Sequence, residues 1–187
     1  SISIVTVGFL TNLAALLKSA PDQYSSLTGY ELVKKKVKRL VSMGGRFPSG
    51  KEFNIDQDAA ASIYAFEHWP SPVWFSGFEI GLKIKTGLPL IHNDSIQNSP
   101  VKDVFRICIP LAAEDSAGRK SWDETAVLVV ATGYSPYYTL KEGRIEIAAD
   151  GSNTWNDSGK GQFHLVEKWP PEKVQDLING LMQHQPK

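Results

Sequence analysis

Cysteine, net charge and long apolar runs are what this sequence has least of. The 187 residues include one cysteine, Cys108, which excludes an intramolecular disulfide and a cysteine-based zinc site. Lys and Arg total 20 and Asp and Glu also total 20, so the formal net charge is zero. A dedicated nucleic-acid binder needs a basic surplus for its phosphate contacts, so we expect no nucleic-acid partner.

No segment has the length of a membrane-spanning helix, so we expect no membrane partner. The apolar stretch from Ile2 to Leu17 lacks a basic start and is interrupted by Thr6, Thr11 and Asn12. It therefore predicts a buried strand followed by a helix rather than a signal peptide, and a cytoplasmic location is expected. Apolar residues at 42% and charged residues at 21% are typical of a globular protein, and the length predicts one domain over 1–187.

Short β-branched runs alternate with segments of helical periodicity along the chain. Strands are predicted at 4–7, 40–43, 72–75, 144–147 and 162–166, and helices at 11–17, 30–38, 56–68, 101–109, 121–130 and 170–181. The segment 87–100 is predicted to be a loop, and the segment 150–161 is predicted to be rich in turns. This alternation indicates an α/β fold with an open, mostly parallel sheet and helices on both faces. Ligands in such sheets bind beyond the carboxyl ends of the strands, which directs attention to Val7-Gly8 and Met43-Gly44-Gly45.

Side chains near the predicted helix starts indicate specific local contacts. Asp56 is expected to cap the helix that follows it, and Ser121 with Glu124 matches the S-x-x-E capping box. Glu31 lies four residues before Lys35. The basic cluster there is therefore expected to be a solvated helix face, with an ion pair, rather than a nucleic-acid patch.

Three segments could carry chemistry, and each has a plain structural explanation when taken alone. They are Val7 to Asn12, then Met43-Gly44-Gly45 with Glu52-Phe53-Asn54, and finally Trp122-Asp123. In this order they resemble the inosine–uridine-preferring nucleoside hydrolases, a family of metal-dependent N-ribohydrolases. The family pattern reads G-x-L-T-N, then M-G-G, then E-F-N, then a helix that bears an aspartate. The resemblance runs over essentially the whole chain.

The resemblance implies a role for each matching residue. The carbonyl of Val7 and the carboxylate of Asp123 would be calcium ligands, in keeping with the oxygen ligands that calcium prefers. Glu52 and Asn54 would bind the ribose hydroxyls from the same side of an extended chain, and Met43 would pack near the sugar.

Trp122 stands where many family members carry a histidine that helps to protonate the leaving base. A tryptophan there resembles the purine-preferring branch, in which the indole stacks on the base. The other interpretation is a tryptophan buried at a helix start, and both remain open. The resemblance makes Trp122 and Asp123 the candidate catalytic residues.

The chain departs from the family pattern at one place, because the aspartate cluster D-x-D-x-x-x-D-D is missing. That cluster supplies most metal-binding carboxylates and the general base, so we expect an N-terminally truncated family fold with weak calcium binding. Relocated carboxylates are a further possibility, with Asp56, Asp58 and Glu79 as candidates.

Two functions follow. The first is hydrolysis of purine ribonucleosides to ribose and base, completed by a segment or companion chain that supplies the cluster. The second is an inactive shortened homologue that binds a ligand or partner. The sheet edge uncovered by the truncation is expected to promote a homo-oligomer.

Overall fold

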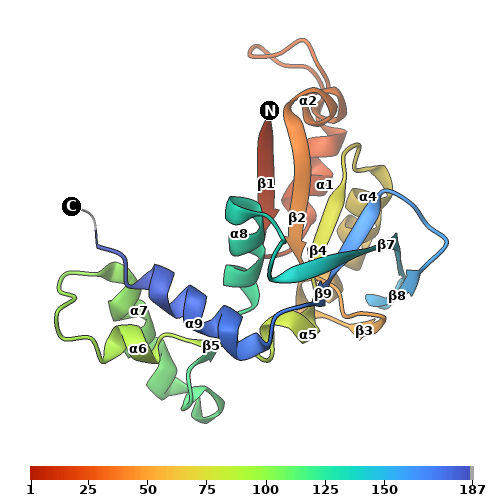
Figure 1. Ribbon diagram of the computed structural model, residues 1–187. Coiled ribbons are helices and arrows are strands. Elements are labelled where there is room, and N and C mark those ends of the chain that lie inside the picture. Colours follow the sequence, from red (N-terminus) through yellow and green to blue (C-terminus); the bar gives the residue numbers. More distant parts are fainter. Residues whose placement is uncertain (186–187) are drawn as a thin grey trace.

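The structure, a computed structural model, describes residues 1–185 and contains a seven-stranded sheet (Figure 1). The strands in sheet order are β1 (Ile2–Thr6), β2 (Val37–Met43), β4 (Val73–Ser76), β9 (Gln162–Glu167), β7 (Tyr138–Ile147), β8 (Ser152–Asn156) and β3 (Ser49–Lys51). The first four are mutually parallel, whereas the last three join by antiparallel pairing. Because β8 returns to the direction of β9, most of the strands run the same way, as the sequence predicted.

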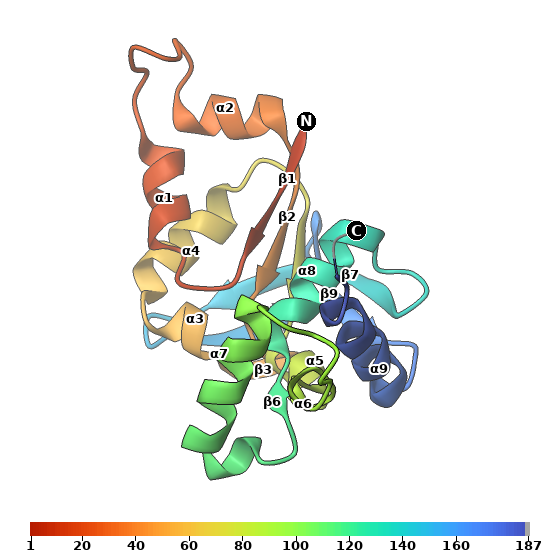
Figure 2. The ribbon, with the colours of Figure 1, turned by 90° about the vertical axis from the view of Figure 1, so that its left-hand side faces the viewer.

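Helices cover both faces of this sheet, which confirms the predicted fold class (Figure 2). One face carries α1 (Thr11–Lys18), α2 (Gly29–Lys36), α3 (Phe53–Asp56) and α4 (Ala59–His68). The other carries α5 (Phe78–Gly81), α8 (Trp122–Thr132) and α9 (Pro171–Met182), with α6 (Leu88–Ile91) and α7 (Pro100–Cys108) further out beside the short pair β5 (Lys85–Thr86) and β6 (Arg119–Lys120). None of the helices in residues 1–185 is both long and apolar enough to traverse a bilayer.

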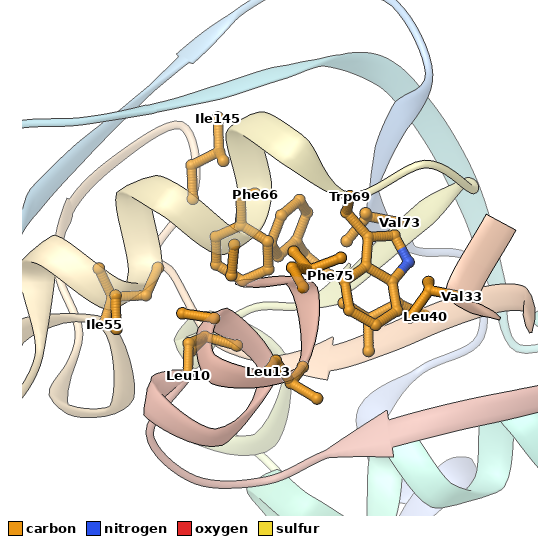
Figure 3. Close-up of a cluster of buried hydrophobic side chains, with 14 of the residues drawn as sticks. Leu10, Leu13, Val33, Leu40, Ile55, Phe66, Trp69, Val73, Phe75 and Ile145 are labelled. Carbon is orange, nitrogen blue, oxygen red and sulfur yellow. The ribbon is translucent and has the colours of Figure 1, made fainter. Parts of the chain in front are cut away.

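Alternating side chains of β2 divide the core into two layers. Leu40 packs with Leu13, Phe66 and Phe75 on the α1 and α4 side, and Figure 3 shows this cluster. Val41, the next residue, packs in the second layer beneath α8 and α9. Successive side chains of a strand point to opposite faces, so β2 is buried on both sides and its carboxyl end is held firmly in place.

The prediction that the first strand is buried is wrong. Within the described part of the chain β1 pairs only with β2, so it is the edge of the sheet. Ile2 is consequently 59% exposed. A β-branched run shows that a strand forms, but whether that strand is covered depends on its neighbours in space.

We expect this edge to drive self-association, because an unpaired strand presents free N–H and C=O groups to another chain. An apolar groove of about 550 Å³ lies beside it, lined mainly by α8 and α9, and both Val127 and Leu181 are exposed there. Light scattering over a wide concentration range should show an oligomer that Ile2→Lys weakens. The control Tyr24→Lys lies in an exposed loop and should have no effect. A monomer at every concentration would contradict this expectation.

The predicted cap of the fourth helix is wrong by two residues. Asp58, not Asp56, caps α4, because its carboxylate accepts a 3.0 Å hydrogen bond from the Ala61 N–H. Asp56 instead ends the single turn of α3 and forms a 2.9 Å ion pair with Lys51. The chain makes one short helical turn, α3, before α4 begins. The spacing of apolar residues does not separate these two helices, so the predicted helix starts too early.

Two other predicted contacts also differ. Glu31 forms a capping box with Thr28, accepting from its N–H at 2.8 Å, and no ion pair with Lys35 occurs among residues 1–185. Ser121 does not cap α8 through the backbone; its hydroxyl donates to the Glu124 carboxylate at 2.9 Å. Glu31 thus bonds a different residue from the one predicted, whereas Ser121 bonds the predicted residue through its carboxylate and not through its backbone N–H.

The segment 150–161, predicted to be rich in turns, also contains strand β8. β8 pairs with β7 on one side and with the three-residue β3 on the other. The segment 87–100 likewise begins with a turn of helix, α6. Elements this short depend on tertiary pairing more than on their own sequence.

Candidate functional site

A cavity of about 270 Å³ opens beyond the carboxyl ends of β1 and β2. Nine residues line it: Val7, Met43, Glu52, Phe53, Asn54, Phe78, Arg119, Trp122 and Asp123. All six site residues singled out in the sequence are among these nine. They come from three segments far apart in the chain, and the sheet brings them together at the edge where parallel sheets bind ligands.

Glu52 is a buried carboxylate that holds two turns of backbone together. It is 4% exposed, and its Oε1 accepts from the Asn54 N–H at 2.9 Å. Its Oε2 accepts from the N–H groups of Gly45 at 3.2 Å and Ile55 at 3.3 Å. Burial raises the pKa of Glu52, and these three hydrogen bonds oppose that rise. The expected extended Glu52-Phe53-Asn54 segment is therefore wrong, because Glu52 caps the helical turn of α3.

Asn54 has its amide orientation fixed by Met43. Its Nδ2 donates to the carbonyl of Met43 at 3.1 Å and contacts the sulfur at 3.2 Å. No group within residues 1–185 donates to its Oδ1, so this oxygen is open to a ligand hydroxyl. Met43 itself is buried, and it positions Asn54 at the wall of the cavity.

Trp122 is fixed at the start of α8 with its indole against Phe78. The indole N–H donates to the carbonyl of Phe78 at 2.9 Å, and the ring centroids lie 5.3 Å apart. Gly81 lies directly behind, and a Cβ there would come within 2.4 Å of the Trp122 Cα. Trp122 also packs against the second core layer, so it lines the cavity and fills the core at the same time.

Asp123 is an exposed carboxylate in the first turn of α8, at the mouth of the cavity. It accepts no hydrogen bond from the described residues, although the positive end of the helix favours its charge. Burial raises the pKa of Asp123, Glu124 adds to the rise, and Arg119 opposes it. A carboxyl group that lines a cavity, has a shifted pKa and accepts no hydrogen bond is a candidate for a chemical role and not for a structural one.

Asp123→Asn should therefore stabilise the protein at neutral pH. Between the ordinary and the raised pKa, the folded protein binds more protons at Asp123 than the unfolded chain does. The contribution of Asp123 to stability thus falls as pH rises through this window. Urea unfolding should give equal stabilities well below pH 3.8, where the carboxyl is neutral in both states, and a more stable Asn variant at pH 7. A less stable variant at pH 7 would contradict the assignment.

The residues present do not fit a calcium ion. Calcium takes six to eight oxygen ligands. Val7 and Asp123 lie at the cavity as expected, but Glu52 is occupied by three N–H groups. In the described 1–185 range, no group of three or more His, Cys, Asp or Glu side chains could hold a metal ion.

The alternative carboxylates lie outside this cavity. Asp56 pairs with Lys51 and Asp58 caps α4. Glu79 accepts from the Phe47 N–H at 3.1 Å and lines a different cavity. The possibility that these three residues replace the missing cluster is wrong for this site.

Arg119, Phe53 and Phe78 line the cavity although sequence reasoning missed them. Phe78 follows the carboxyl end of β4, and β4 lies next to β2 in the sheet. Knowing this strand order would have placed Phe78 at the same edge as the cavity. Arg119 lies four residues before Asp123, so a search for charged neighbours of the motif could have found it.

Several solved structures share this fold. The plant nucleoside hydrolase PpNRh1 is 20% identical, with a TM-score of 0.71 over 98% of this chain and 62% of that chain. An inosine-guanosine nucleoside hydrolase is 18% identical, with a TM-score of 0.71 over 98% and 62%. The type III effector protein XopQ, complexed with adenosine diphosphate ribose, is 15% identical, with a TM-score of 0.66 over 98% and 60%.

The chain spans about three fifths of the length of these structures. No individual curated protein is similar enough in sequence to count as a match. The family described as inosine-uridine preferring nucleoside hydrolase, however, matches residues 1–175, nearly the whole chain. This match, together with the shared fold, shows that the chain belongs to the inosine-uridine preferring nucleoside hydrolase family.

Proposed function

We propose that this chain binds a purine ribonucleoside in the cavity of Glu52, Asn54 and Trp122, and that the site serves hydrolysis of the N-glycosidic bond. One observation carries the proposal: family-motif residues from three separate segments line a single cavity at the ligand-binding edge of the sheet. The products would be ribose and the free base.

The ribose hydroxyls would bind to Glu52 and Asn54. Asn54 offers an amide oxygen to which no group in residues 1–185 donates, and Met43 holds its amide in place. Glu52 already accepts three N–H bonds, but an ionised carboxylate has about four acceptor sites, so one remains for a hydroxyl. Both residues could therefore accept from adjacent hydroxyls of the same sugar.

The base would stack on Trp122. Its ring is held by Phe78, so little freedom is lost when a base packs on it. A purine offers a larger face than a pyrimidine, and a protonated purine is attracted to the negative face of the indole. The indole N–H is already donated to a carbonyl, so Trp122 would stabilise the departing base by stacking and not by giving it a proton.

Hydrolysis also requires a group that takes a proton from water. Within 1–185, Asp123 is the one cavity carboxyl without a hydrogen-bond partner, and its pKa is raised by burial. One such group without a well-held metal should give slow turnover. Further carboxylates, from the same protein or a companion chain, would complete the site.

Calorimetry and a base-release assay test the proposal together. Adenosine and inosine should bind about tenfold more tightly than uridine, because the purine gains stacking area. Added calcium should leave that binding unchanged, and base release by this chain should be slow. Absence of binding by any nucleoside would contradict the proposal. Rapid base release would overturn the assignment of Asp123 as the one available proton acceptor.

A further inference from the structure

The loop 45–47, which follows β2, has its backbone fixed by side chains. Its three N–H groups donate to side-chain oxygens of Glu52, Asn153 and Glu79, at 3.2, 3.0 and 3.1 Å in that order. These acceptors come from three separate parts of the chain, namely the cap of α3, strand β8 and helix α5. Of the three acceptors only Glu52 lines the cavity, so the other two hold the loop from outside it.

Glu79 lies in α5 and holds the far end of this loop. Its Oε2 accepts from the Phe47 N–H at 3.1 Å. Its Oε1 lies against Gly77, where a Cβ would come within 2.3 Å of that oxygen. The carboxylate fits there because Gly77 has no side chain, and the close backbone leaves it little room to move.

The Glu79 carboxylate is stabilised mainly by the loop that it holds. The side chain is half-buried, and across residues 1–185 it forms no ion pair. Burial raises the pKa of Glu79, and the Phe47 N–H opposes that rise more than any other group does. A half-buried carboxylate without a paired cation needs such a hydrogen bond to remain charged.

Two hydrogen bonds of Gly45 join this loop to the walls of the cavity. Its N–H donates to Glu52, and its carbonyl accepts from the Phe78 N–H at 2.8 Å. Phe78 precedes Glu79 in the sequence, so two consecutive residues hold both ends of the loop. A shift at Phe47 would therefore displace Gly45, two residues earlier, and with it the N–H that fixes the Glu52 carboxylate.

We propose that Glu79 is a positioning residue for the candidate site, which holds the loop 45–47 so that the Gly45 N–H fixes the Glu52 carboxylate. This inference rests on the proposed function, in which Glu52 binds the sugar. Glu79 does not line that cavity, so it acts through the loop and not on the ligand. Its loss should weaken the binding of every ligand that contains the sugar by the same factor, whichever base the ligand carries.

Affinities for adenosine, uridine and ribose test this in a Glu79→Ala variant. All three should fall by a factor of about 3 to 10, the effect expected for one lost hydrogen bond. The ratio of adenosine to uridine affinity should not change, because stacking on Trp122 is unaltered. Glu79→Gln keeps an acceptor oxygen at the same reach and should restore most of the affinity. Glu79→Asp keeps the charge but is one methylene too short, so it should not, and it remains informative if Glu79→Ala folds poorly.

The amide NMR signal of Gly45 gives a readout that needs no ligand. In Glu79→Ala this signal should move to higher field, because its hydrogen bond to Glu52 is weakened, and Glu79→Gln should return it. Glu31→Ala is the matched control. Glu31 also accepts from a backbone N–H, that of Thr28 at 2.8 Å, but it does not line the cavity. It should leave the Gly45 signal and all three affinities unchanged.

The outcomes separate this inference from the proposed function. Unchanged affinities in Glu79→Ala overturn the inference and leave nucleoside binding intact. A loss for adenosine without a loss for ribose also overturns it, because the effect would then pass through the aromatic wall. So does a Glu79→Gln variant that binds as weakly as Glu79→Asp, because charge and reach would then not be separable from general disruption. No binding of any of these ligands by the unaltered chain contradicts both proposals.

Discussion

A Glu52→Ala variant should lose ribose binding and about 2 to 3 kcal/mol of folding free energy. The loss of stability follows because the N–H groups of Gly45, Asn54 and Ile55 would all lose their shared acceptor. Ribose binding should be lost for two reasons. The carboxylate that accepts a ribose hydroxyl is gone, and the backbone N–H groups that it held no longer fix the cavity wall. Urea unfolding and calorimetry with ribose would measure the two effects.

Asp58→Ala is the control for this experiment. Asp58 also caps a helix through its carboxylate, but it lies outside the cavity. Loss of this partly buried cap should cost about 1 kcal/mol and leave ribose affinity unchanged. A Glu52→Ala protein that binds ribose normally would show that Glu52 is only structural.

A Trp122→Ala variant should lose adenosine affinity by a factor of about 5 to 150, the range expected when one base loses its aromatic partner. Its affinity for ribose, which has no base, should change little. Trp122→Phe should retain part of the adenosine affinity, because a smaller ring can still stack. The comparison of adenosine with ribose separates stacking from general disruption of the cavity.

Trp169→Ala is the matched control. Trp169 is a partly buried indole that packs on Tyr137, with ring centroids 5.2 Å apart, and it does not line the cavity. Its removal should cost packing energy and leave both affinities unchanged. Equal loss of adenosine affinity in the two variants would contradict stacking on Trp122.

Much of the parallel half of the fold could be predicted from the sequence. The apolar runs around Val41 and Phe75 are short and β-branched or aromatic, and helical periodicity separates them. Both residues are fully buried in β2 and β4, as such runs require. At these positions the local sequence favours a buried strand, and the fold places a buried strand there. The sequence alone therefore predicts them correctly.

The antiparallel end of the sheet could not be predicted in the same way. β3 has three residues, and β8 lies among Gly, Asn and Asp residues that favour turns. Their pairing is supported by Asn153, whose side chain exchanges two hydrogen bonds with the backbone of Arg46. Such contacts span 107 residues of sequence and leave no local signal.

The placement of a residue at this cavity was predictable wherever the residue belongs to a family motif, as Glu52, Asn54 and Asp123 do. The detailed environment of these residues was not predictable, because the three N–H groups on Glu52 depend on how α3 turns against Gly45. Arg119 was missed because its place in the cavity depends on the β5–β6 pairing and on its ion pair with Asp115.

The central claim is that the cavity of Glu52, Asn54 and Trp122 binds a ribonucleoside, and an amide NMR titration with adenosine tests it most directly. The backbone N–H signals of Gly45, Asn54 and Ile55, which bond to Glu52, should shift saturably together with the Trp122 indole N–H. No saturable shift, or saturable shifts confined to the separate cavity around Trp69 and Gly161, would contradict the claim.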